Sequence, residues 1–181
     1  MGCIAIIYGT TEGQTRKIAR ELADHFIRRR DEVRLVDATH PPAEDPLAGA
    51  DAVIVAASLH VERYQSSVVH FAAEHARQLN ALPSAFVSVS LSALGDEEDA
   101  ANVDLCVDRF SEQTGWTPGT VHQAAGALRY TQYDFFKRWI MKRIAKEHGL
   151  PTQSGGDFEF TDWAALQRFA EDFAHGVGST V

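Results

Sequence analysis

The chain has 181 residues and a formal net charge of −8, with 45% hydrophobic and 23% charged residues. This length suits one domain with its own core, and the composition is typical of a soluble globular protein. The acidic balance excludes general nucleic-acid binding, which requires a basic face. No segment resembles a signal peptide or is apolar enough to span a bilayer, so we expect a cytoplasmic protein. Cys3 and Cys106 lack metal-site or redox spacing, and no metal site is expected.

The strongest local signal is a loop near the N-terminus. It follows the apolar run 3–7, typical of a buried strand, and precedes a helical pattern over residues 16–30. Its residues are Thr10, Thr11, Glu12, Gly13, Gln14 and Thr15. A helix start offers unpaired N–H groups and a positive dipole end, and the threonine hydroxyls add donors. The pattern T-x-x-G-x-T therefore predicts a phosphate site and resembles the FMN phosphate loop of flavodoxin-like proteins.

The glycines of this loop and the motifs that it lacks bear on the phosphate prediction, and one alternative to a phosphate site exists. Gly9 and Gly13 are expected to permit tight backbone turns and the close approach of a ligand. The G-x-x-x-x-G-K-[ST] and G-x-G-x-x-G phosphate motifs are both missing from the chain. The alternative to a phosphate site is an ordinary helix start, in which Thr11 and Gln14 form a capping box.

The remaining apolar segments predict strands that alternate with helices. Strands are expected at 33–36, 51–58, 85–89 and 120–127. The intervening helices run through Val68 to Leu79 and from 96 to 110, and a last helix begins near Thr161. This alternation predicts an α/β, three-layer fold with a parallel sheet covered on both faces. The resemblance to flavodoxin-like proteins implies a flavodoxin-like fold with a five-stranded sheet in the order 2-1-3-4-5. We expect one domain over residues 1–181.

Ligands of such sheets bind beyond the carboxyl ends of the strands, so two strand-exit loops are expected to meet the phosphate loop. The first contains Ser58, Leu59, His60, Val61 and Tyr64. The second contains Ser90, Leu91, Ser92, Ala93, Leu94 and Gly95. Both would flank an isoalloxazine ring through backbone groups, with stacking from His60 or Tyr64. His60 is also a candidate to assist proton removal.

A long insertion, at about 129–160, precedes the last helix and far exceeds the usual connection of about two to six residues. Between residues 129 and 148 it holds six basic and two acidic side chains, a local charge of 6 − 2 = +4. A basic amphipathic helix over 133–148 is typical of a membrane-surface or partner-binding element, although its apolar side would equally suit packing on the domain. The candidates for substrate or membrane contact are Arg129, Tyr130, Lys137, Arg138 and Trp139.

Several stretches together carry a specific resemblance. They are Gly13-Gln14-Thr15-Arg16, Ala57-Ser58, Leu79-Asn80, Pro83-Ser84-Ala85-Phe86, Ser88-Val89, Gly126-Ala127-Leu128-Arg129-Tyr130 and Thr161-Asp162-Trp163. The chain resembles the flavodoxin-type menaquinone-dependent protoporphyrinogen IX dehydrogenases of haem biosynthesis. The resemblance implies FMN as cofactor, oxidation of protoporphyrinogen IX to protoporphyrin IX, and menaquinone or ubiquinone as acceptor. It also implies a peripheral place on the cytoplasmic face of the inner membrane.

One departure and several alternatives accompany this resemblance. The segment Asp96–Asp99 is acidic, where a basic segment is expected in the family, which puts the acceptor or substrate preference in question. The porphyrin carboxylates would meet Arg129, Lys137 or Arg138, because guanidinium matches carboxylate geometry. The alternatives are a flavodoxin-type electron carrier, an FMN-dependent quinone reductase, and a binding domain that has lost its flavin. A homo-oligomer is left open.

Overall fold

The computed structural model describes residues 2–90, 97–128 and 158–178. In chain order its elements are β1 (Cys3–Gly9), α1 (Gln14–Arg28), β2 (Glu32–Asp37), β3 (Ala52–His60), β4 (Arg63–Tyr64), α2 (Ser66–Glu74), α3 (Ala76–Ala81), β5 (Ser84–Ser90), α4 (Glu97–Thr114), β6 (Thr120–Ala125), β7 (Ala127–Leu128), β8 (Phe158–Glu159) and α6 (Trp163–Gly178). The main sheet has the order β2-β1-β3-β5-β6, and all four of these pairings are parallel. The order predicted from the sequence is confirmed, because β4 only adds a short antiparallel pairing to β3.

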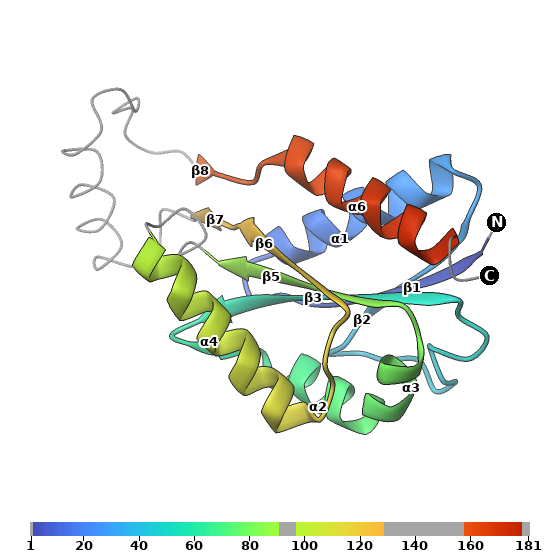
Figure 1. The fold of residues 1–181 in the computed structure, drawn as a ribbon, viewed down its shortest axis with the longest axis horizontal. Helices are drawn as coiled ribbons and strands as arrows, with labels where there is room; N and C mark the ends of the chain where they lie inside the picture. The colour runs from blue at the N-terminus through green and yellow to red at the C-terminus, as the bar shows by residue number, and fades with distance from the viewer. Residues whose placement is uncertain (1, 91–96, 129–157, 179–181) are drawn as a thin grey trace.

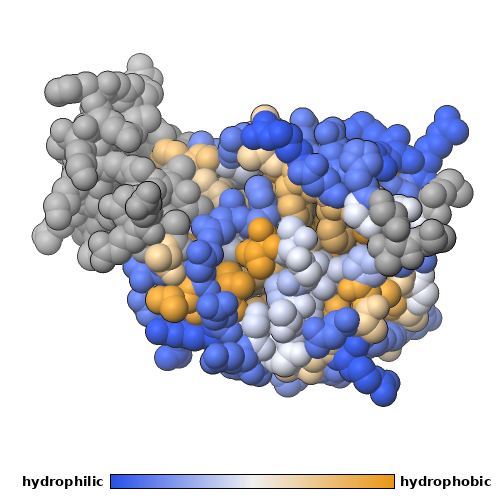
Figure 2. Space-filling view, viewed as in Figure 1, coloured by the Kyte–Doolittle hydropathy of each residue, from blue (hydrophilic) through white to orange (hydrophobic). Residues whose placement is uncertain are grey.

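Helices cover both faces of the sheet, with α1 and α6 on one face and α2, α3 and α4 on the other (Figure 1). Strands β1 and β5 are buried at every position. Burial on both faces explains the continuous apolar run of β1, whereas β5 also holds buried serines. Ile18, Leu22 and Phe26, which recur every four residues, form the buried face of α1 against the sheet. The outer surfaces of the helices are largely hydrophilic, with apolar residues visible between the elements (Figure 2).

Two predicted elements are each divided in the structure. The helix predicted through Val68 to Leu79 breaks at His75, whose imidazole stacks on Phe71 with ring centroids 4.2 Å apart. The strand predicted over 120–127 ends at Ala125, and Gly126 separates β6 from β7. Strand β7 leaves the parallel sheet and pairs antiparallel with β8, so the chain before and after the insertion lies side by side. Among the described residues, no helix is both long and apolar enough to cross a membrane.

The half-buried imidazole of His122 predicts a pH dependence of stability. It stacks on Phe169 with ring centroids 4.8 Å apart, and burial lowers its pKa below the ordinary 6.5, although Asp162 partly opposes the shift. The unfolded chain therefore takes up this proton first as the pH falls below about 6.5, and the free energy of unfolding decreases. Urea unfolding between pH 5 and 7 gives the slope of the free energy of unfolding against pH. We expect His122→Phe to reduce this slope by at most about 1.4 kcal/mol per pH unit. Identical slopes for the two proteins would contradict this.

Candidate functional site

The carboxyl ends of β1, β3 and β5 lie at one edge of the sheet. Gly9 is in register with Ala57, and Ser58 with Val89, so the loops that follow these strands leave from the same edge. The third predicted loop is represented only by Ser90, which is buried at the end of β5. The loop residues that lie outside the described ranges are Leu91, Ser92, Ala93, Leu94 and Gly95.

The loop before α1 has the geometry of an anion site. Gly13 is the residue before the helix and has a φ of 95°, a left-handed conformation that suits glycine. Its N–H donates to Thr10 Oγ1 at 2.8 Å, so Thr10 shapes the turn. No described residue accepts a hydrogen bond from the N–H groups of residues 14–16, which point out of the helix start. Glu12 would contribute through its backbone N–H, since its carboxylate would repel a phosphate.

The predicted capping-box alternative is wrong. The helix start has no side-chain capping bond. Thr11 Oγ1 instead accepts from the side chain of Gln65 at 3.1 Å, and the amide of Gln14 donates to Thr161 Oγ1 at 2.8 Å. Both side chains are therefore occupied by tertiary contacts, so the N–H groups of the first helical turn are left for a ligand.

Thr15 supplies the most direct indication of a ligand. Its side chain is completely buried, and no described residue forms a hydrogen bond with its Oγ1. An unpaired buried hydroxyl costs roughly 1–3 kcal/mol, so such groups are rare without a reason. A phosphate oxygen at the start of α1 would accept this hydrogen bond together with those of the neighbouring N–H groups. The residues present therefore fit the phosphate of a flavin nucleotide.

Gln65 joins two loops of the candidate site, although no sequence pattern indicates it. Its Nε2 donates to Thr11 Oγ1 and to Ser58 Oγ, which joins the phosphate loop to the loop after β3. Its Oε1 is buried and has no hydrogen-bond partner among the described residues. Gln65 stands directly before α2, where the sequence shows only an unremarkable helix start. Its role depends on the meeting of two loops that are far apart in the sequence.

Gly9 is needed for helix packing, whereas the expectation that it permits the approach of a ligand stays a prediction. A Cβ atom at Gly9 would lie only 2.4 Å from Cγ2 of Val68 on α2. The absence of a side chain lets α2 approach the end of β1. That approach brings Gln65 to the phosphate loop.

The loop after β3 is a tight hairpin that ends in β4. His60 pairs with Arg63, and the two turn residues Val61 and Glu62 have φ values of 47° and 60°. Positive φ at both positions is typical of a type I′ turn, although Val is an unusual residue there. The turn leaves His60 exposed and Val61 94% exposed, whereas Leu59 is half-buried. The exposed tip is thus available to a ligand.

Tyr64 does not have the exposed position that stacking on a flavin requires. Its ring is 8% exposed and packs edge-on against Phe86 and Phe110, and its hydroxyl shares a hydrogen bond with Ser88 Oγ at 2.9 Å. Burial raises the pKa of the phenol well above its usual value. Tyr64 therefore acts as a core residue that supports the hairpin, and His60 remains the candidate for stacking.

A hydrogen-bonded connection ties the first turn of α1 to the segment before α6. Thr161 Oγ1 accepts from Gln14 and donates to the carbonyl oxygen of Ala125 at 2.7 Å. Lys17 donates to Glu159 at 2.5 Å, and this bond lowers the pKa of the Glu159 carboxyl. The phosphate loop is thereby fixed against the point where the chain returns from the insertion.

Thr161→Val is expected to lower the free energy of unfolding by about 1–2 kcal/mol, because the Gln14 amide and the Ala125 carbonyl both lose their partner. Urea unfolding of the cofactor-free protein measures the change. Thr161→Ser keeps the hydroxyl and is the matched control. A valine variant as stable as the serine variant would show that the connection adds nothing.

The two cysteines are buried and free. Burial is the largest influence on both and raises the pKa of each thiol, which keeps it protonated and unreactive. Within residues 2–90, 97–128 and 158–178, no group of three or more His, Cys, Asp or Glu side chains could hold a metal ion.

The predicted substrate or membrane contacts cannot be placed relative to this site. They are Arg129, Tyr130, Lys137, Arg138 and Trp139, and all lie outside the described residues, as does the predicted helix over 133–148. The helix α4 begins within the acidic segment, at Glu97.

Solved structures similar to this one include flavodoxins. Flavodoxin 1 from Bacillus cereus superposes with a TM-score of 0.58 at 14% identity, covering 96% of this chain and 97% of that one. A flavodoxin from Streptococcus pneumonia TIGR4 gives a TM-score of 0.55 at 21% identity, covering 96% of this chain and 99% of that one. At these identities the similarity establishes the fold.

Sequence comparison assigns the chain to a family within this fold. The Flavodoxin domain family model Flavodoxin_5 matches residues 5–154. The chain is 36% identical over 173 residues to "Protoporphyrinogen IX dehydrogenase [quinone]" of Leishmania major, covering 93% of this chain and 73% of that protein. It is 32% identical over 170 residues to the protein of the same name from Escherichia coli K12, covering 94% of this chain and 93% of that protein. The chain therefore belongs to the flavodoxin-fold protoporphyrinogen IX dehydrogenase (quinone) family.

Proposed function

We propose that this protein is an FMN-dependent enzyme that oxidises protoporphyrinogen IX to protoporphyrin IX with a quinone as electron acceptor. The names of its relatives support the substrate and the acceptor. The observation that carries the cofactor assignment is the buried hydroxyl of Thr15, which has no described partner and lies at the helix start of the phosphate loop.

FMN is favoured over a dinucleotide because the loop offers one phosphate site and the chain lacks the G-x-G-x-x-G motif. The phosphate would be held by the N–H groups of residues 14–16 and the hydroxyl of Thr15. The backbone of Ser58 to Val61 would flank the ring system, with Ser90 and the loop after it on the other side. Bound FMN supplies reversible two-electron chemistry.

Within this proposal the chain positions the cofactor and handles protons. The Gln65 bridge between Thr11 and Ser58 fixes the spacing of the phosphate and ring loops. His60 is exposed at the end of β3, where an imidazole nitrogen would take up a proton released from the substrate. The hairpin would thus combine a ring contact with a proton acceptor.

The acceptor in this proposal is menaquinone or ubiquinone, both of which reside in membranes. We place the protein peripherally on the cytoplasmic face of the inner membrane, because the insertion at about 129–160 carries a local charge of +4 over residues 129–148. A basic, aromatic-containing helix suits an anionic lipid surface.

The test is anaerobic turnover of protoporphyrinogen IX by the purified, FMN-loaded protein. Porphyrin fluorescence should rise only when menaquinone or ubiquinone is added. Three quinones should be reduced for each porphyrin formed, since six electrons leave in pairs. A protein that cannot be loaded with FMN would contradict the cofactor assignment. A flavin-loaded protein that leaves protoporphyrinogen unchanged would favour the electron-carrier alternative.

A further inference from the structure

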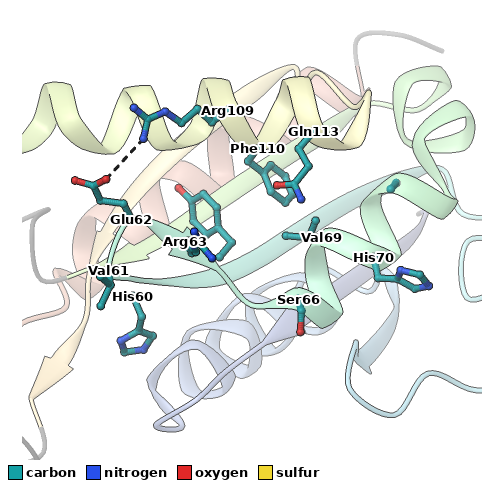
Figure 3. A pocket seen from close by; sticks show the side chains of 12 residues that line it. His60, Val61, Glu62, Arg63, Ser66, Val69, His70, Arg109, Phe110 and Gln113 are labelled. Atoms are coloured by element: carbon teal, nitrogen blue, oxygen red, sulfur yellow. Dashed lines mark ion pairs between the residues drawn. The ribbon is translucent and has the colours of Figure 1, made fainter.

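A large open cleft lies on the α2–α4 side of the hairpin between β3 and β4 (Figure 3). Its volume is about 1250 Å³, larger than the roughly 300–1,000 Å³ of ordinary small-ligand pockets. The lining residues come from the hairpin, from α2 and from α4. None of them belongs to the phosphate loop at 10–15. The cleft and the predicted flavin site therefore share only the hairpin.

The chemistry of the lining is amphiphilic. The apolar part of the wall includes Tyr64, Val69 and Phe110, of which Tyr64 and Phe110 belong to the buried aromatic cluster beneath it. The charged part holds two arginines, Arg63 and Arg109, against a single acid. In a protein with a net charge of −8, this is a locally basic surface. Such a lining suits an apolar molecule that carries negative groups.

The single acid is Glu62, and its ion pair with Arg109 crosses the cleft from the hairpin to α4 (Figure 3). Nη1 of Arg109 and Oε2 of Glu62 are 3.7 Å apart. The side chain of Arg109 is 66% exposed and that of Glu62 is 73% exposed. An ion pair this exposed is worth little, because water screens it and two long side chains must be ordered. A ligand carboxylate would therefore displace Glu62 from Arg109 at small cost.

We propose that this cleft binds the carboxylate-bearing edge of the tetrapyrrole substrate, with Arg63 and Arg109 as the carboxylate partners. This inference rests on the proposed function. The apolar body of the substrate would lie on the Val69 and Phe110 wall and extend past His60, which belongs both to the cleft and to the predicted ring-binding loop. The hairpin would thus separate the anchored carboxylates from the flavin. Arginine is suited to the role because its guanidinium binds a carboxylate through two parallel hydrogen bonds.

Quinones lack carboxylates, so this arrangement predicts a selective effect. Loss of Arg63 or Arg109 should raise the KM for protoporphyrinogen and leave the KM for the quinone unchanged. Glu62 competes with the ligand for Arg109, so its loss should act in the opposite direction. If the Glu62–Arg109 pair had only a structural role, loss of either partner would change the KM for protoporphyrinogen in the same direction.

The experiment uses the FMN-loaded protein and protoporphyrin IX, the stable product, as the binding probe. We expect R63Q and R109Q each to raise its Kd by roughly 5- to 10-fold, and E62Q to lower it by roughly 2- to 3-fold. R77Q alters an exposed arginine of α3 outside the cleft and should bind like the parent protein. Protoporphyrin IX dimethyl ester, measured in the same detergent buffer, lacks the charges and should bind all variants equally. Visible spectra and thermal unfolding confirm that the variants are folded and loaded.

The possible outcomes distinguish this proposal from the proposed function. The cleft proposal is overturned if R63Q and R109Q bind protoporphyrin IX like the parent. It is also overturned if these variants bind the dimethyl ester as much more weakly than the parent does as they bind the acid. Turnover of protoporphyrinogen by the parent would then still support the enzyme assignment. If the parent shows no turnover but the arginine variants selectively lose the acid probe, the enzyme assignment fails and the cleft is supported.

Discussion

Replacing Thr15 by valine is expected to raise the dissociation constant for FMN by about 30- to 100-fold and to make the cofactor-free protein slightly more stable. A hydrogen bond from a buried hydroxyl to a charged phosphate contributes roughly 2–3 kcal/mol to binding. Without FMN the same hydroxyl is completely buried and has no described partner, so its removal eliminates a desolvation cost. The two changes have opposite signs, which no general loss of folding would produce.

Titration of the cofactor-free protein with FMN, followed by flavin fluorescence, measures the affinity, and urea unfolding measures the stability. Thr15→Ser retains the hydroxyl and should bind FMN within a few-fold of the parent. Thr117→Val alters an exposed threonine before β6, far from the loop in the sequence, and controls for the substitution itself. Unchanged FMN affinity in Thr15→Val would remove the main support for a phosphate at the start of α1.

Trp116→Ala should lower the free energy of unfolding by about 3–5 kcal/mol, the largest stability loss that we expect from a single substitution here. Trp116 is completely buried, with its ring centroid 5.8 Å from that of Phe86 and 6.0 Å from that of Phe110. Its indole N–H also donates to Ser84 Oγ at 3.2 Å. The alanine variant loses apolar burial and leaves a cavity in the core between the sheet and α4.

Urea unfolding of both proteins at the same pH tests this prediction. Trp116→Phe keeps an aromatic ring but not the indole N–H, so about 1–2 kcal/mol should be lost. Trp163→Ala removes a half-buried tryptophan from the opposite face of the sheet and should cost less than Trp116→Ala. A loss below about 1 kcal/mol in Trp116→Ala would show that the aromatic cluster is not a main source of stability.

The fold could be predicted from the sequence because its signals are local. The strand β1 is apolar at nearly every position, β3 contains the apolar run 52–57, and the repeat of Ile18, Leu22 and Phe26 marks the buried face of α1. Alternation of such segments leaves few topologies, since parallel crossovers are right-handed. The strand order followed from that constraint and from the resemblance to flavodoxins.

The candidate site was only partly predictable. Gly13 and Thr15 could be named because glycine and hydroxyl residues at a helix start have a local meaning. Gln65 could not be named, because its importance comes from two hydrogen bonds to loops that the fold brings together. Tyr64 was assigned to the flavin because it follows β3, but the adjoining hairpin turns its ring into the aromatic core.

The sequence by itself determined the α/β class and the position of the phosphate loop, since each depends on periodicity or on residues adjacent in the chain. The sheet order needed, in addition, the resemblance to flavodoxins. Only the tertiary structure decided which polar side chains remain available to a ligand. Gln14 and Thr11 are taken up by Thr161 and Gln65, whereas the Thr15 hydroxyl has no described partner. The cleft beside Arg109 is likewise built from three separate elements. Such availability depends on distances between segments remote in sequence, which no local pattern encodes.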